Sequence, residues 1–345
     1  MRAPSLRAPD FWAGSARAQR PTAGLLSGLL SPLAAVFDLA GRLRRATTRP
    51  RVLPIPVICV GNLVAGGAGK TPVVLALIRA LAGHDLSIHV LTRGYGGTAA
   101  GPLRVDPDRH DAVVVGDEAL LLARQAPTWV ARDRPAGAQA AMAEGAQLLI
   151  LDDGFQNPTL AKDLSLLVVD GGFGFGNGRL IPAGPLRETV SRGLARADAT
   201  VLLGADATGL AERLSAAGPL LWARLASAGD QSGLAGRKVF AFAGIGRPEK
   251  FFDSLASVGA ELAVCRAFPD HHGYSVGEVE SLLAEAARLK ALPITTEKDA
   301  VRLPESLRER VTVLPVEIVW QDEAALSALL APLLARRSEP PEADG

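Results

Sequence analysis

Eight consecutive residues have the types and order of a phosphate-binding loop: Val64-Ala65-Gly66-Gly67-Ala68-Gly69-Lys70-Thr71. Glycines let backbone N–H groups converge on phosphate oxygens, and the N-terminus of a following helix adds a positive dipole. In such loops the lysine reaches the β- and γ-phosphates and the hydroxyl residue binds Mg²⁺, roles that fall here to Lys70 and Thr71. Val64 stands where the usual pattern has its first glycine, so this loop departs from the commonest form.

Two adjacent carboxylates, Asp152 and Asp153, follow the apolar run 148–151. A carboxylate at the end of a buried strand often holds Mg²⁺ in nucleotide-binding folds. An aspartate pair can also cap a turn or a helix, but a phosphate loop upstream favours the metal role. The following Gly154 and Phe155 predict a tight turn that brings Gln156 near the phosphates.

Asp117 is the best candidate for a general base that takes a proton from a hydroxyl acceptor. It and Glu118 begin a helical pattern, where either carboxylate could instead cap the helix. His271, in the polar loop 268–272, could orient or tune such an acid, although a histidine in a loop can equally be structural.

Several further residues are candidates to bind an anionic substrate, because a guanidinium group binds phosphate in a bidentate way. The arginines are Arg93, Arg132, Arg134 and Arg187, and Tyr95, Glu118 and Gln156 complete the set. The segment Thr296-Glu297-Lys298-Asp299 resembles a guanine-specificity motif only superficially, because its lysine and aspartate are adjacent. The sequence therefore favours ATP over GTP.

Alternating apolar strands and helices must position these residues. Strands are expected at 55–60, 87–91, 128–130, 147–151 and 164–169, with helical patterns at 73–78, 116–122 and 135–144. This alternation predicts a P-loop NTPase-like α/β fold whose parallel sheet gathers ligands at the carboxyl ends of its strands. A second series of strands, at 239–243, 260–267, 293–296 and 311–316, predicts a smaller second α/β domain.

The length of 345 residues favours more than one domain. We expect an N-terminal membrane-interacting helical segment at 1–51, a P-loop kinase domain at 52–237 with a Gly-rich hairpin or lid near 171–185, a C-terminal α/β domain at 238–335 and a disordered tail at 336–345. A net charge of +1 gives no argument for a nucleic-acid partner. Two distant cysteines in apolar runs, Cys59 and Cys265, indicate a reducing compartment.

The N-terminal segment carries apolar residues at helical spacing, no charge over 22–37, and then five arginines between 42 and 51. A membrane-spanning helix needs about 20 strongly apolar residues, and this run is shorter and broken by Asp38. An amphipathic helix that lies on a membrane surface fits better. The alternative is a helix packed on the protein's own core.

The motifs together resemble one family, the tetraacyldisaccharide 4'-kinases of lipid A biosynthesis. The matching strings are Gly61-Asn62-Leu63, Gly66-Gly67-Ala68-Gly69-Lys70-Thr71-Pro72, Thr92-Arg93-Gly94-Tyr95, Gly116-Asp117-Glu118, Asp152-Asp153-Gly154-Phe155-Gln156, Gly178-Arg179-Leu180-Ile181-Pro182-Ala183-Gly184-Pro185-Leu186-Arg187-Glu188, Phe268-Pro269-Asp270-His271 and Thr296-Glu297-Lys298-Asp299-Ala300-Val301. They follow the family's order from about residue 54 to residue 303.

The resemblance implies an ATP- and Mg²⁺-dependent kinase that phosphorylates the 4'-hydroxyl of a tetraacylated glucosamine disaccharide 1-phosphate, a lipid A precursor. It implies a peripheral or monotopic location at the cytoplasmic face of the bacterial inner membrane. The family's catalytic aspartate maps onto Asp117, its partner histidine onto His271, and its acidic pair onto Asp152 and Asp153. Asn157 stands where the family usually has histidine.

Two other functions remain open from the sequence. A membrane-recruited P-loop switch would hydrolyse nucleotide to control a partner, but the guanine motif is absent and Ala65 replaces a second loop lysine. A soluble small-molecule kinase would use the leucine-rich N-terminus as part of its core.

Overall fold

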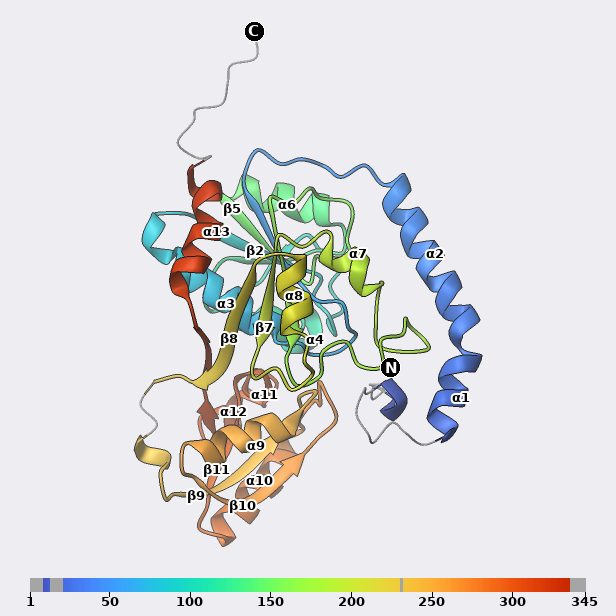
Figure 1. Ribbon diagram of the computed structural model, residues 1–345. Helices are drawn as coiled ribbons and strands as arrows, with labels where there is room; N and C mark the ends of the chain where they lie inside the picture. The colour runs from blue at the N-terminus through green and yellow to red at the C-terminus, as the bar shows by residue number, and fades with distance from the viewer. Residues whose placement is uncertain (1–8, 13–20, 230–231, 336–345) are drawn as a thin grey trace.

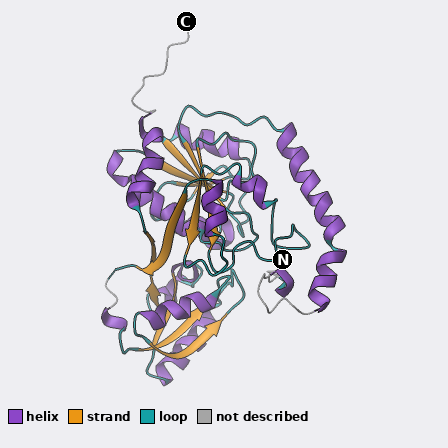
Figure 2. Ribbon diagram, viewed as in Figure 1, coloured by secondary structure: helices purple, strands orange, loops and turns teal. Residues whose placement is uncertain are grey.

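The computed structural model describes residues 9–12, 21–229 and 232–335. The expected tail at 336–345 and parts of the expected N-terminal segment, at 1–8 and 13–20, lie outside these residues. Within the described chain the strands form two sheets, a large one of nine strands and a small one of four (Figures 1 and 2).

The large sheet has the order β13-β8-β7-β6-β1-β5-β2-β4-β3. Its strands are β1 (Val57–Gly61), β2 (Ile88–Thr92), β3 (Leu103–Arg104), β4 (Thr128–Val130), β5 (Leu148–Asp152), β6 (Leu164–Asp170), β7 (Ala199–Leu203), β8 (Leu220–Ser227) and β13 (Val316–Trp320). Pairing is parallel except at the two edges, where β3 and β13 run antiparallel to their neighbours. β1, β5 and β6 are buried along their whole length, which explains why they are mainly apolar, with Ser165 in β6 and an aspartate at the end of β5 and of β6 as the polar exceptions.

Helices cover both faces of the large sheet, because successive side chains on each strand point to opposite sides. Ile58 and Val60 of β1 pack with α3 (Lys70–Leu81) and α13 (Glu323–Ala335). Val57 and Cys59 pack on the other side with α6 (Arg134–Ala143), α7 (Val190–Leu194) and α8 (Ala211–Ala217). The remaining helices on this sheet are short: α4 (Ala112–Val115) and α5 (Asp117–Ala123).

The small sheet has the order β10-β9-β11-β12 and is parallel throughout. Its strands are β9 (Lys238–Ala243), β10 (Glu261–Ala267), β11 (Leu292–Thr296) and β12 (Thr312–Leu314), and its helices are α9 (Pro248–Ser257), α10 (Val276–Arg288), α11 (Glu297–Ala300) and α12 (Glu305–Arg308). Separate apolar cores fill the two faces of this sheet. The sequence prediction of a P-loop-like α/β fold with a second, smaller sheet is confirmed.

The division of the chain differs from the expected one after β12. The expected range 238–335 contains β13 and α13, which belong to the large sheet. Ile318 of β13 and Leu326, Leu330 and Leu333 of α13 enter the large core, and β13 pairs with β8 from Val316 to Trp320. The chain therefore returns to the first sheet, because these apolar faces complete its edge.

The Gly-rich segment 171–185 was expected to be a hairpin or a lid, and the expectation of a hairpin is wrong. The segment is a series of turns without strands, and Gly174, Gly176 and Gly178 all have positive φ. A Cβ on Gly176 would lie 2.4 Å from the carbonyl oxygen of Trp12. These left-handed residues turn the chain too often for a strand ladder to form.

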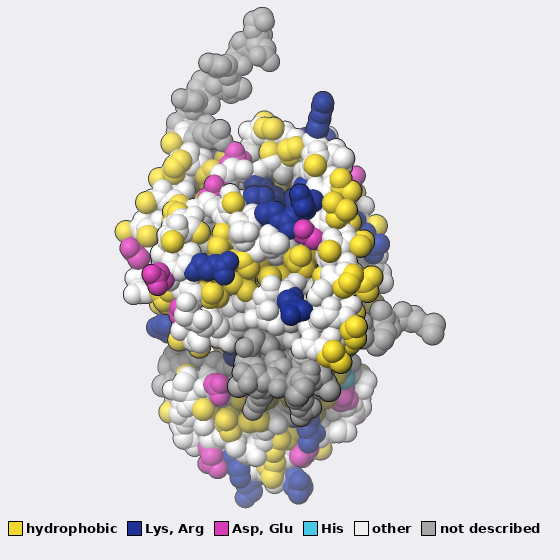
Figure 3. Space-filling view, turned by 45° about the vertical axis from the view of Figure 1, so that its right-hand side comes forward, with side chains coloured by type: hydrophobic (Ala, Val, Ile, Leu, Met, Phe, Trp, Pro, Cys, Tyr) yellow, Lys and Arg dark blue, Asp and Glu magenta, His cyan; other side chains and the backbone are white. Residues whose placement is uncertain are grey.

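Helices α1 (Pro21–Leu29) and α2 (Ser31–Thr47) run along one side of the large domain (Figure 1). Their large apolar side chains do not join the core: Leu25, Leu26, Leu29, Leu33, Val36, Phe37, Leu39 and Leu43 are 41–69% exposed. Figure 3 shows hydrophobic side chains gathered along this edge, with Lys and Arg side chains beside them. The alternative that this segment packs on the protein's own core is therefore wrong for these residues. Among the described residues, no helix is both long and apolar enough to cross a membrane.

Candidate active site

The glycine-rich loop joins β1 to the first turn of α3, as the sequence predicts. Gly69 has φ 84°, and a Cβ there would lie 2.3 Å from Leu203 Cδ2, so only glycine fits. Nothing lies within 4 Å of the Cβ positions of Gly66 and Gly67, so the backbone of this part of the loop is open to a ligand. Val64 replaces the usual first glycine of the loop. Its side chain is buried and its backbone forms an isolated β-bridge with Leu186, so this residue fixes the start of the loop to a distant segment.

Lys70 is held at the mouth of this loop by two polar partners. Its Nζ lies 3.4 Å from Asn62 Oδ1 and 3.6 Å from Asp153 Oδ1, while Thr71 is buried beside it at the start of α3. Asn62, fully buried, also donates through Nδ2 to the carbonyl of Gly66 at 3.4 Å. Sequence reasoning assigned no role to Asn62, although its position directly after β1 was a usable signal.

Asp152 closes β5 with a carboxylate that has no protein partner. The side chain is fully buried, and within the described residues neither Oδ1 nor Oδ2 accepts a hydrogen bond. Burial, and after it the charge of Glu118, raises the pKa of Asp152 to about 7. Buried carboxylates without donors are costly unless they meet a cation, so this residue fits a divalent metal ion.

Asp153 faces the phosphate loop in a strained conformation, with φ 53°. Arg187 Nη1 donates to both carboxylate oxygens, at 2.8 and 3.1 Å, and also to Gln156 Oε1 at 3.3 Å. Burial alone would raise the pKa of Asp153, but the charges of Lys70 and Arg187 lower it below its usual value. Gln156 in turn donates to the carbonyl of Asn62 at 2.8 Å, so this cluster is continuous with the loop.

The candidate arginines do not all reach this cluster. Arg134 is buried and its Nη2 donates to the carbonyl oxygen of Asp152 at 3.2 Å, whereas Arg132 is exposed and donates to Thr98 O. Arg93 is also exposed. Burial is the largest cause that lowers the pKa of Arg134, and the charge of Arg93 is a smaller cause in the same direction. Asn157 accepts from the backbone N–H and hydroxyl of Thr159, so its side chain stabilises a local turn.

Asp117 and His271 meet across the seam between the two sheets. Asp117 begins α5 on the large sheet, His271 lies in the loop after β10, and His271 Nδ1 donates to Asp117 Oδ2 at 2.8 Å. Asp117 is 2% exposed, and burial alone would raise its pKa. The hydrogen bond from His271 and the charges of Lys298 and Arg302 outweigh that effect and lower the pKa of Asp117 to about 2.

Three neighbours surround this pair. The ring of Tyr95 lies 5.4 Å from that of His271, and Lys298 Nζ lies 3.1 Å from Glu118 Oε1. Arg302 Nε lies 3.3 Å from Asp117 Oδ2. Sequence reasoning missed Arg302, although it directly follows the segment 296–301 that had been singled out.

The pair and the phosphate loop belong to one electrostatic site. The charges of Glu118, Lys70 and Asp153 all act on the buried carboxyl of Asp152, so the start of α5 and the loop both face the end of β5. The phosphate loop, Asp152 and the start of α5 are therefore treated as parts of one candidate site.

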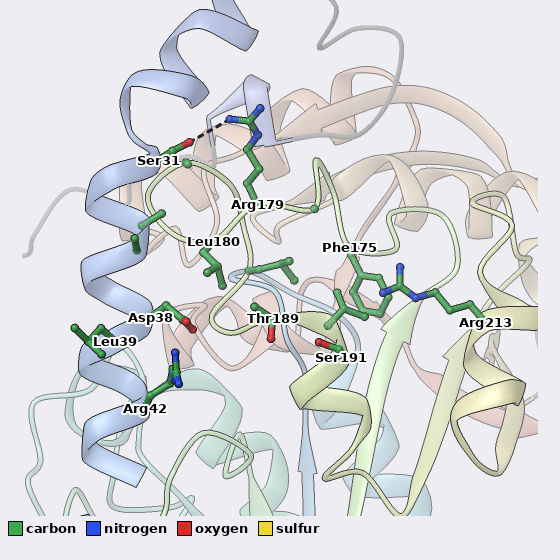
Figure 4. Close-up of a pocket in the computed structure, with 16 residues that line it drawn as sticks. Ser31, Asp38, Leu39, Arg42, Phe175, Arg179, Leu180, Thr189, Ser191 and Arg213 are labelled. Carbon is green, nitrogen blue, oxygen red and sulfur yellow. Dashed lines mark hydrogen bonds between the residues drawn. The ribbon is translucent and has the colours of Figure 1, made fainter. Parts of the chain in front are cut away.

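A pocket of about 720 Å³ lies beside this site, under the N-terminal helices. Ser31, Asp38, Leu39 and Arg42 of α2 line one wall, and Phe175, Leu180, Thr189 and Ser191 line the other (Figure 4). Arg179 donates to the Ser31 hydroxyl at 3.2 Å and Arg192 pairs with Asp38, so polar contacts tie α2 to the segment that also carries Arg187.

Comparison with known proteins gives one consistent result. Residues 26–335 match the family described as Tetraacyldisaccharide-1-P 4'-kinase. Relatives named Tetraacyldisaccharide 4'-kinase from Rhodospirillum centenum and Paramagnetospirillum magneticum are 56% and 57% identical, covering 97% and 94% of this chain and 98% of each relative. A crystal structure of LpxK from Aquifex aeolicus, an "apo" form in complex with ATP, is 27% identical with a TM-score of 0.73, covering 90% of this chain and 99% of that one. The chain belongs to the tetraacyldisaccharide-1-P 4'-kinase family.

Proposed function

We propose that this chain transfers the γ-phosphate of ATP, with Mg²⁺, to the 4'-hydroxyl of a tetraacyldisaccharide 1-phosphate at a membrane surface. The family membership makes it a kinase of the lipid A precursor. ATP in the related LpxK structure supports the nucleotide. The observation that carries the residue assignments is the buried carboxylate of Asp152, which has no hydrogen-bond partner among the described residues. The charges of Lys70 in the loop and of Glu118 beside the Asp117–His271 pair both act on it.

The loop amides of residues 64–69 and Lys70 are assigned to the ATP phosphates. Asp152, with Thr71 and Asp153, is assigned to the metal, which would supply positive charge against the transferring phosphoryl group. Arg187 holds Asp153 through two hydrogen bonds and is placed to meet a further anionic group through its remaining N–H donors. Arg93, Tyr95, Glu118, Arg134 and Gln156 are assigned to substrate contact or to holding those groups in place.

The Asp117–His271 pair is assigned to proton acceptance. Asp117 is ionised well below neutral pH, and His271, which is the more exposed partner, is hydrogen-bonded to its carboxylate. The pair would take the proton of the acceptor hydroxyl as its oxygen attacks the γ-phosphorus, with Asp117 as the base and His271 as its partner. Lys70 and the loop amides stabilise the charge that builds on the phosphoryl oxygens.

The N-terminal helices are assigned to the membrane surface. The exposed leucines of α1 and α2 lie beside Arg42, Arg44 and Arg45, a combination that favours the interface of an anionic bilayer. The pocket under α2 is placed to receive part of the acylated substrate (Figure 4). The membrane would be the cytoplasmic face of the inner membrane, where ATP is available.

The decisive experiment is transfer of labelled γ-phosphate from ATP to a tetraacyldisaccharide 1-phosphate in detergent micelles. Wild type should form labelled lipid, and Asp117→Ala should lower turnover about 10²-fold while ATP binding remains. Asp253→Ala, which removes an exposed carboxylate on α9, is the matched control and should retain full turnover. ATP hydrolysis without lipid labelling would instead support a nucleotide switch.

A further inference from the structure

The segment from Thr296 to Arg302 begins at the last residue of β11, and two of its cations contact the surroundings of the Asp117–His271 pair. We propose that Arg302 is a positioning residue that fixes the geometry of this pair across the seam between the sheets, and that Lys298 supports it in this role. This inference rests on the proposed function of the pair. It assigns a role to a sequence motif that neither the phosphate loop nor the acidic pair explains.

Arg302 contacts both members of the seam at once. Its Nε lies 3.3 Å from Asp117 Oδ2, the oxygen that also accepts from His271. Its Nη1 donates to the carbonyl of His272 at 3.0 Å, and its Nη2 donates to the carbonyl of Gly244 at 3.0 Å. A planar guanidinium can make these contacts simultaneously, whereas an ammonium group cannot span them.

Arg302 is itself held rigidly. Its side chain is 4% exposed, and Nη2 lies 3.0 Å from Oδ1 of the fully buried Asp299. The same carboxylate oxygen accepts from Tyr274 Oη and from the Gly244 backbone N–H, both at 2.8 Å. Arg302 is therefore anchored beside the small sheet, where its Nε–H also donates to the carbonyl of Lys298 at 3.0 Å, and its charge forms an ion pair with Asp117 beside the large sheet.

Lys298 makes a second bridge across the seam, between the residues next to Asp117 and His271 in the chain. Its Nζ lies 3.1 Å from Glu118 and 4.0 Å from Asp270, which are the chain neighbours of Asp117 and His271. His271 has φ 58°, a conformation that a non-glycine residue keeps only when surrounding contacts hold it. The two cations supply such contacts on both sides of the seam.

The same arrangement predicts an electrostatic effect. The charged groups facing Asp117 are His271, Lys298 and Arg302, with Glu118 beside it in the chain and Asp270 behind His271. Removing a cation weakens the preference for the ionised carboxylate, so the pKa of Asp117 rises. We expect the acid limb of the kcat profile, which follows protonation of the Asp117 carboxylate, to move to higher pH.

The test measures kcat, both KM values and the pH profile for Arg302→Gln, Arg302→Lys and Lys298→Met in the full chain with ATP, Mg²⁺ and the tetraacyldisaccharide 1-phosphate. We expect Arg302→Gln to lower kcat about 10²-fold, with each KM changed less than about 3-fold and the acid limb shifted upward. Arg302→Lys should recover part of that loss. Arg266→Gln is the matched control. Arg266 lies on β10 of the small sheet and forms an ion pair with Glu285 of α10.

A double variant separates positioning from general stabilisation. Because Arg302 acts through Asp117, adding Arg302→Gln to Asp117→Asn should cost less than about 2-fold. An unchanged kcat and pH limb in Arg302→Gln, or a full additional loss in the double variant, would overturn the inference. If Arg302→Gln does not fold, Lys298→Met carries the same comparison. Failure of wild type to label the lipid would refute the proposed function instead.

Discussion

The phosphate loop and the Asp117–His271 seam are built in opposite ways. The loop takes its glycines and Lys70 from one short segment between β1 and α3, and its shape depends on glycine conformations that are local. The seam joins residues 154 positions apart, from two different sheets, through a single 2.8 Å hydrogen bond and two bridging cations.

This difference separates nucleotide binding, which we assign to the loop, from proton acceptance, which we assign to the seam. The contacts described for the loop come from its own segment and from the large domain, so we expect it to bind nucleotide whatever the small sheet does. The proposed proton acceptor needs Asp117 from the large domain and His271 from the small one. Binding of ATP and transfer of phosphate should therefore be separable by mutation, and the following predictions test that separation.

The largest effect is expected at the loop. Lys70→Ala removes the cation that we assign to the ATP phosphates and should lower phosphate transfer about 10³-fold, with weaker ATP binding. Rates of lipid labelling and binding of a fluorescent ATP analogue measure both effects. Lys238→Ala, a lysine at the start of β9, should change neither. Retention of more than about a tenth of the wild-type rate would remove Lys70 from the mechanism.

At the seam the two partners should behave as one unit. Asp117→Asn and His271→Gln should each lower kcat about 10²-fold, and the double variant should lie within about 3-fold of Asp117→Asn. ATP affinity should stay within about 2-fold of wild type in all three, unlike Lys70→Ala. Fully multiplied losses would mean that the two side chains act independently.

The exposed leucines should affect access rather than chemistry. Leu29→Ser combined with Leu33→Ser should lower binding to anionic vesicles about 10-fold, because two large apolar side chains no longer leave water. Flotation with vesicles measures the partition, and melting temperature should stay unchanged. Val276→Ser, which changes a 50% exposed apolar residue on the small domain, is the control. Unaltered vesicle binding would contradict the role of α1 and α2.

The smallest effect concerns stability and pH at Asp152. Its folded pKa of about 7 lies above the usual 3.8, so the folded chain retains a proton that the unfolded chain releases. Its contribution to the free energy of unfolding therefore falls as pH rises from about 4 to 7. Asp152→Asn should melt a few degrees above wild type at pH 8 without Mg²⁺, and this gain should shrink at pH 5. Added Mg²⁺ should raise the melting temperature of wild type only; stabilisation of both would exclude Asp152 from the metal site.

Much of this molecule follows from short stretches of sequence. The apolar runs of β1, β5 and β6, the glycine-rich turn and the helix of Lys70 are local patterns, and each was predicted close to its observed bounds. The acidic pair at the end of β5 followed from the same logic. The residue types suggested that His271 could orient Asp117, and the family resemblance implied the same pairing, although no spacing rule links the two residues.

Tertiary structure alone decided the rest. Asn62 and Arg302 lie in or beside motifs that the sequence singled out, but only burial against the loop and the seam shows which groups they contact. The return of β13 to the large sheet and the turns of 171–185 likewise depend on which apolar faces and left-handed glycines meet distant neighbours. Sequence determined the elements and the local loop because backbone preference and periodicity act over a few residues. Contacts between residues far apart in the chain were decided by packing, because their energies exist only once both sheets have formed.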